Sequence, residues 1–165
     1  MNFLTLNAGE AIYVPADAPH AYLSGDIVEC MARSNNVLNT GFCPRADRDS
    51  IELFTSSLTF GPHSKEDVLL QATSTGKGKN GKTEDYKPGM SEFNMMKTTL
   101  QEGDTEVIEK VDGPSVLFVT SGSGKLTAET GSHDLKKGFV FFVGQGVETK
   151  YEADQDLVLY RAYAE

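Results

Sequence analysis

The stretch from Gly9 to Ala32 constrains the fold of this chain more than any other. Gly9 opens a short apolar segment, residues 11–14, and Pro15 ends it. His20 follows five residues after that proline, at the start of a second apolar segment. Because a turn framed by glycine and proline lets the chain fold back, the imidazole of His20 is expected to point into the mouth of a β-barrel. A neutral ring nitrogen there can bind zinc or another first-row metal.

The residues after His20 predict a tight β-hairpin. Its turn is centred on Gly25, which can take a positive φ at no steric cost. A two-residue turn places His20 opposite Glu29, and side chains alternate between the two faces of a strand. His20, Tyr22 and Glu29 are therefore expected on one face. A single strand histidine is more often structural than a ligand, so the metal hypothesis depends on the spacing of glycine, proline and histidine.

That spacing resembles the second metal-binding motif of cupin barrels, and the chain contains it twice. Residues 138–151 overlay residues 9–22 position for position, from glycine to tyrosine. In the second copy Thr149 stands where the first copy has His20. We therefore expect the second copy to be a structural scaffold without its ligand, and we expect function in the first.

Composition excludes several classes of partner. The chain has 165 residues, of which 39% are hydrophobic and 24% charged, as in an ordinary soluble globular protein. A formal net charge of -9 argues against nucleic acid or an anionic membrane, because both need a basic face. No window approaches a membrane-spanning length. Cys30 and Cys43 lack a C-x-x-C spacing, so we expect free thiols in a cytoplasmic protein.

One short helix is expected at about residues 50–58. Asp49 can cap it, and Glu52 stands three residues later in capping-box register. The apolar positions that follow have helical spacing. They are Ile51, Phe54 and Leu58.

From residue 91 onward the pattern is all-β. Seven short apolar runs are separated by glycine and aspartate turns, which is typical of a sandwich or barrel. The runs are residues 93–100, 105–111, 115–120, 124–129, 139–143, 148–153 and 157–163. The expected fold is all-β, with a cupin (jelly-roll) barrel at 91–165 preceded by a partial cupin lobe at 1–60 with one short helix. Residues 61–90 lose apolar periodicity and are expected to connect the two.

A phosphate-binding pattern, G-x-x-x-x-G-K-[ST], occurs inside this connector at residues 76–83. A phosphate loop needs a buried strand before it and a helix after it. Polar residues 71–75 precede the pattern, and residues 84–88 cannot start a helix. We therefore interpret the match as accidental.

The residues after Pro19 carry a more specific resemblance. The sequence Pro19-His-Ala-Tyr-Leu-Ser-Gly-Asp-Ile-Val-Glu-Cys-Met-Ala32, with Asn36-Val and Gly41-Phe, resembles type I mannose-6-phosphate isomerase. The likeness extends through Phe60, and the second barrel takes the place of that family's C-terminal domain. The resemblance implies an aldose–ketose isomerase that interconverts mannose 6-phosphate and fructose 6-phosphate and supplies GDP-mannose. Its substrate would be a sugar phosphate.

The resemblance also implies a divided metal site. In the family, zinc is held by a Gln, a His and a Glu from the N-terminal portion and by a fourth ligand that corresponds to His20. Only this last ligand is present, so the zinc site is incomplete in this chain. Tyr22 and Glu29 correspond to residues of the substrate pocket, which agrees with the face deduced from the hairpin register.

Two positions depart from the family pattern. Its Ser-Asp-Asn is Ser34-Asn35-Asn36 here, and its catalytic arginine is replaced by Asn39. The basic residue that follows Thr-Pro in the family corresponds to Arg45, after Cys43-Pro44. A guanidinium that can stabilise an enediolate or a sugar phosphate is therefore missing at residue 39, and an amide cannot supply that charge-assisted bonding. The catalytic candidates are thus Glu29, Tyr22, Asn39 and Arg45.

Three interpretations remain open. The first is the C-terminal portion of the isomerase, inactive as an isolated chain. The second is a non-catalytic cupin module for sugar binding or protein interaction, and the third is a two-lobed β-protein without a ligand. In each case the incomplete first barrel should expose sheet edges and apolar surface, which favours self-association.

Overall fold

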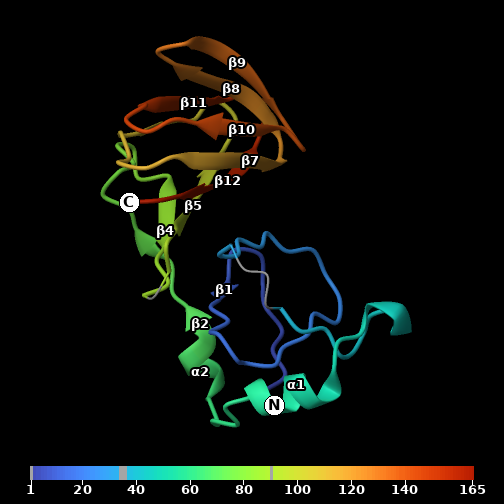
Figure 1. The fold of residues 1–165 in the computed structure, drawn as a ribbon. Coiled ribbons are helices and arrows are strands. Elements are labelled where there is room, and N and C mark those ends of the chain that lie inside the picture. Colours follow the sequence, from blue (N-terminus) through green and yellow to red (C-terminus); the bar gives the residue numbers. More distant parts are fainter. Residues whose placement is uncertain (1, 34–36, 90) are drawn as a thin grey trace. The chain divides into compact units, whose positions relative to one another are not determined.

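The computed structural model describes residues 2–33, 37–89 and 91–165 (Figure 1). The chain divides into two units, each described here by itself. The N-terminal unit comprises Met1–Leu6 and Ile12–Leu69, and the barrel unit comprises Asn7–Ala11 and Leu70–Glu165. Among the described residues no helix is long and apolar enough to cross a membrane.

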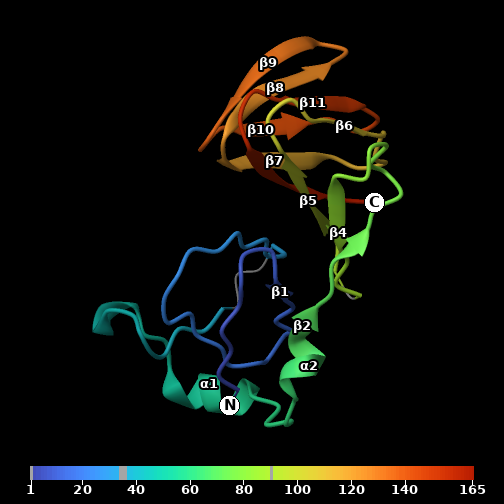
Figure 2. The same ribbon diagram turned by 180° about the vertical axis from the view of Figure 1, so that it is seen from behind.

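The barrel unit consists of two antiparallel sheets that lie face to face, as both views show (Figures 1 and 2). The six-stranded sheet has the order β10-β7-β12-β5-β4-β3, and the four-stranded sheet has the order β6-β11-β8-β9. The first contains β3 (Thr73–Ser74), β4 (Thr83–Tyr86), β5 (Asn94–Leu100), β7 (Ser115–Ser121), β10 (Val140–Val143) and β12 (Leu157–Tyr163). The second contains β6 (Thr105–Ile108), β8 (Ser123–Ala128), β9 (Gly131–Lys136) and β11 (Thr149–Ala153). This is the all-β, jelly-roll type of architecture expected from the sequence.

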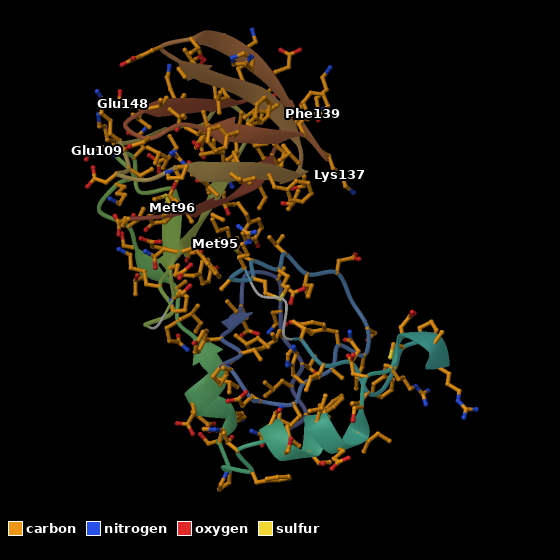
Figure 3. The ribbon with its side chains drawn as sticks, in the orientation of Figure 1. Met95, Met96, Glu109, Lys137, Phe139 and Glu148 are labelled. Atoms are coloured by element: carbon orange, nitrogen blue, oxygen red, sulfur yellow. The ribbon has the colours of Figure 1, made fainter. Side chains whose placement is uncertain are left out.

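The core of the barrel unit forms because side chains alternate along its strands. On β5, for example, Met96 is buried and its neighbour Met95 is only partly so (Figure 3). Inward-facing residues of both sheets make one cluster, and fully burying a side chain such as leucine contributes about 1.5–3 kcal/mol. The cluster comprises Met96, Leu100, Ile108, Val111, Leu117, Val119, Leu126, Leu135, Tyr151, Ala153, Leu157, Leu159 and Tyr163.

All seven predicted strands are present, and the structure adds strands that the sequence analysis did not predict. β4 lies in the expected connector and pairs with β5. Its inward-facing residues Thr83 and Asp85 are polar, so its sequence does not alternate between apolar and polar residues. Asp85 is stabilised inside by a hydrogen bond that it accepts from the Tyr163 hydroxyl at 2.9 Å. β9 was missed because Leu135 is its one buried residue.

The N-terminal unit has little regular structure. Its helical elements are η1 (Arg45–Asp47), α1 (Ile51–Ser57) and α2 (Lys65–Val68). Two further strands of the chain, β1 (Ala11–Ile12) and β2 (Leu69–Leu70), form a two-stranded sheet. The hairpin predicted after His20 is wrong as a pair of strands, because no described residue from 13 to 64 is in a strand. Two strands alone are marginally stable in water, and no strand among the described residues pairs with residues 20–29.

The predicted helix is confirmed as α1, but its cap differs. The side chain of Ser50 accepts the hydrogen bond from the Leu53 N–H at 3.3 Å. Asp49, the predicted cap, instead accepts one from the N–H of Asn39 at 2.7 Å.

The internal repeat is visible in the backbone. Gly9 and Gly138 have φ values of 94° and 89°, and Asp17 and Gly146, also equivalent in the alignment, have 61° and 74°. A non-glycine residue at positive φ is uncommon. The two copies therefore share the conformation of the turn that precedes His20 and Thr149.

Candidate functional site

His20 is exposed and its ring is oriented by the preceding backbone. Nδ1 lies 3.1 Å from the carbonyl oxygen of Ala18. A neutral imidazole that donates from Nδ1 to this oxygen has a free lone pair on Nε2, and that lone pair can bind a metal. The ring also packs edge-on against Tyr22, with centroids 5.7 Å apart at an interplanar angle of 70°.

Tyr22 connects His20 to Glu29. Its hydroxyl donates a hydrogen bond to Oε1 of Glu29 at 3.2 Å. The structure therefore brings these three residues together in an irregular segment without the predicted strands. Burial raises the pKa of Tyr22, and the charge and hydrogen bond of Glu29 raise it further. The phenol consequently keeps its proton at neutral pH and continues to donate to the carboxylate.

Asn39 and Arg45 make different contacts. The N–H of Asn39 donates to Oδ2 of Asp49, and its carbonyl accepts from the N–H of Asp49, both at 2.7 Å. These bonds tie Asn39 to the residues before α1. Arg45 is exposed in η1. The departure at residues 34–36 lies outside the described residues.

The described residues of this chain do not fit a zinc ion on their own. Among the described residues, no group of three or more His, Cys, Asp and Glu side chains could hold a metal ion. Catalytic zinc uses about three protein ligands. His20 offers one nitrogen, and the Glu29 carboxylate is bonded to Tyr22.

The N-terminal unit exposes much of its apolar surface. Of the described residues before Thr75, none is buried. Exposed apolar surface on this scale marks a site of interaction. Large examples with their exposed fractions are Phe3 79%, Leu23 63%, Met31 66%, Phe42 89%, Ile51 72% and Phe60 77%.

The loop with the phosphate-binding pattern surrounds an anion of the protein itself. The Glu106 carboxylate is fully buried and accepts a hydrogen bond from the N–H of Asn80 at 2.7 Å. No described residue after the loop starts a helix, because Thr83 begins β4. The sequence signal that could have revealed this arrangement is the two-residue spacing between Glu106 and the apolar Ile108, because a glutamate on the inward face of a strand needs hydrogen-bond partners.

The comparisons with known proteins extend over the whole chain. Residues 86–131 match the family model described as phosphomannose isomerase type I C-terminal. All of the chain aligns with mannose-6-phosphate isomerase from Cryptococcus neoformans at 38% identity, covering 37% of that protein. The Saccharomyces cerevisiae mannose-6-phosphate isomerase is also 38% identical over the whole chain, which covers 39% of it. The chain resembles the C-terminal part of type I mannose-6-phosphate isomerases.

The solved structures agree with this resemblance at the level of the fold. A mutant phosphomannose isomerase from Salmonella typhimurium matches 81% of this chain and 32% of its own, with a TM-score of 0.63 and 20% identity. A second mutant of the same enzyme gives a TM-score of 0.62 over 80% of the chain. The chain thus has the fold of part of a phosphomannose isomerase, and it spans less than half the length of the curated relatives.

Proposed function

We propose that this chain forms the C-terminal part of a mannose-6-phosphate isomerase. Such an enzyme interconverts mannose 6-phosphate and fructose 6-phosphate by proton transfer between C1 and C2, so its substrate is a sugar phosphate. The observation that carries the proposal is 36–38% identity along the entire chain to relatives from three fungi that bear this name. The alignment includes the segment with His20, Tyr22 and Glu29, and not only the barrel unit.

In the proposed enzyme, Tyr22 and Glu29 line the sugar pocket. The Tyr22 hydroxyl bonds to one carboxylate oxygen of Glu29, which leaves the other oxygen to accept a proton or a sugar hydroxyl. Arg45 carries a guanidinium that can bind a phosphate through two parallel hydrogen bonds. Asn39 offers only an amide, so in this proposal it binds substrate without stabilising charge.

Zinc, in this proposal, belongs to the assembled protein and not to the isolated chain. His20 supplies one ligand through Nε2, and residues outside this chain supply the others. The isolated chain is therefore inactive as an isomerase. The free thiols of Cys30 and Cys43 are consistent with a reducing compartment, and we place the enzyme in the cytoplasm.

The exposed apolar side chains of the N-terminal unit are the second part of the proposal. In the assembled enzyme they pack against polypeptide that the relatives have in addition to this region. In the isolated chain they favour self-association.

A second candidate function is a non-catalytic cupin module for sugar binding or protein interaction. The observation that favours it is the shortage of metal ligands in the described part of the chain, together with the amide at Asn39. It predicts that no added polypeptide produces isomerase activity.

A fusion protein tests the proposed function against this alternative. The N-terminal part of the Saccharomyces cerevisiae relative, up to the point where this chain begins to align, is joined to residues 1–165 and assayed with mannose 6-phosphate. We expect activity in the fusion and none in either part alone. Glu29→Gln in the fusion should lower kcat about 100-fold or more, whereas the exposed Glu52→Gln should not. A folded, monodisperse fusion without activity would overturn the proposal.

A further inference from the structure

A buried arginine without a negative partner lies in the core of the barrel unit. Arg161, on β12, is 1% exposed and is the largest of the fully buried side chains. Its Nε donates to Oγ of Ser115 at 2.9 Å, and its Nη1 donates to Oγ1 of Thr149 at 3.1 Å. Nη2 is buried and has no hydrogen-bond partner among the residues that the structure describes.

The charge of Arg161 is not balanced by the side chains that contact it. Every ion pair among the described residues has a lysine as its cation. Two carboxylates are buried in the described part of the chain. Glu106 accepts from the backbone N–H groups of Asn80 and Lys82, and Asp85 accepts from a tyrosine hydroxyl. Burying an uncompensated cation is costly, so the site favours an added negative charge.

The hydrogen bonds of the hydroxyl groups around Arg161 leave one more buried donor without an acceptor. Ser115 donates to the carbonyl oxygen of Val143 at 3.3 Å. Thr149 donates to the hydroxyl oxygen of Tyr151 at 3.1 Å, so the proton of that buried phenol needs another acceptor. The Nη2 hydrogens of Arg161 and the hydroxyl hydrogen of Tyr151 thus lack an acceptor among the described residues, and Thr149 bonds to both of these side chains.

We propose that a small monovalent anion of the size of chloride binds in the core of the barrel unit, at Nη2 of Arg161 and the hydroxyl of Tyr151. The internal repeat gives this site a counterpart in the N-terminal unit, because Thr149 and Tyr151 align with His20 and Tyr22. The second copy then binds an anion where the first copy has the expected metal ligand. This inference stands independently of the isomerase activity.

Bromide replaces chloride in such sites and is located by anomalous diffraction. Crystals of the 165-residue chain grown in sodium bromide should give an anomalous peak at hydrogen-bonding distance from Nη2 of Arg161. A peak elsewhere only, or a water molecule at Nη2, would overturn the proposal.

Thermal unfolding provides a test in solution. Replacing sodium gluconate by sodium chloride at equal ionic strength should raise Tm by about 2–4 °C. Arg161→Met should abolish this difference, and the exposed Arg48→Met should retain it. If Arg161→Met does not fold, Tyr151→Phe removes one donor and should reduce the difference. Equal Tm values of the unmodified chain in the two salts would contradict the proposal.

Discussion

The backbone N–H of Lys82 donates a hydrogen bond of 2.7 Å to the carboxylate of Glu106. This contact lies within the loop that matches a phosphate-binding pattern, and the N–H of Asn80 bonds to the other oxygen at 2.7 Å. A Cβ atom on Gly78 would lie 3.1 Å from Oε2, so the glycine lets the backbone approach the carboxylate. The loop therefore places its N–H groups around an anion supplied by β6.

Glu106→Ala tests whether this carboxylate stabilises the loop. Removing the carboxylate leaves the N–H groups of Asn80 and Lys82 without their acceptor, and we expect unfolding in urea to show a loss of about 3 kcal/mol or more. Acetate or formate should restore part of the lost stability by occupying the vacated space. The exposed Glu102→Ala is the control and should change little. A loss below about 1 kcal/mol, or no effect of either anion, would contradict the assignment.

Gly122 should tolerate a side chain less well than Gly103. Both have positive φ values, 79° and 82°, so alanine is strained at either position. A Cβ at Gly122 would also clash with the carbonyl oxygen of Asp156, whereas nothing lies within 4 Å at Gly103. We expect Gly103→Ala to cost about 1 kcal/mol and Gly122→Ala about 3 kcal/mol or more in chemical unfolding. Equal losses would show that the clash relaxes at no cost.

The barrel unit should lose stability between pH 10 and 12. Burial raises the pKa of Tyr86 from its ordinary value of 10.0 to about 12, with help from the charge of Glu84. In this range the unfolded chain releases the proton and the folded chain keeps it, so the free energy of unfolding falls as pH rises. Tyr86→Phe should flatten this fall, and it should cost about 1 kcal/mol at neutral pH because the bond to the Gly9 carbonyl is lost.

In Tyr86→Phe the loss of stability at alkaline pH should become smaller without vanishing, because the pKa of Tyr163 is also raised. Burial is the main cause of that shift, and the hydrogen bond and charge of Asp85 add to it. Tyr13→Phe in the N-terminal unit is the matched control. If the two variants give the same dependence of unfolding on pH, Tyr86 does not titrate in this way.

The isolated chain should associate through its N-terminal unit. Phe42 and Phe60 are 89% and 77% exposed and are large apolar groups in a unit whose described residues include none that is buried. We expect sedimentation velocity to show species larger than a monomer at micromolar concentration. The double variant Phe42→Ser and Phe60→Ser should shift the distribution towards monomer. Phe142→Ser is the control, because Phe142 lies on the barrel unit and is 74% exposed. If the unmodified chain sediments as a monomer, association through the N-terminal unit is contradicted.

The sequence predicted the strands of the barrel unit well because their inward positions are apolar and regularly spaced. β10, for instance, lies in the run from Phe139 to Val143. β4 could not be found in this way, since its inward residues include Thr83 and Asp85 and its stability comes from partners distant in sequence. Tyr163, for example, is 78 residues from Asp85.

The contacts among His20, Tyr22 and Glu29 were predicted from the sequence, but the backbone conformation around them was not. The contacts of Tyr22 with His20 and Glu29 agree with the predicted shared face, although neither flanking segment forms a strand. Strand formation needs neighbours that provide backbone partners, and no local pattern shows whether they exist. The metal-binding role of His20 and the catalytic roles of Tyr22, Glu29, Asn39 and Arg45 remain predictions.

Zinc content tests the central claim most directly. The account states that His20 is one ligand of a metal site that further polypeptide completes. Elemental analysis after dialysis should find about one zinc ion per fusion protein. The isolated 165-residue chain should contain far less than one zinc ion per chain. The fusion that carries His20→Ala should lose its zinc. The exposed His133→Ala fusion should keep its zinc. Stoichiometric zinc in the isolated chain, lost on His20→Ala, would contradict the account.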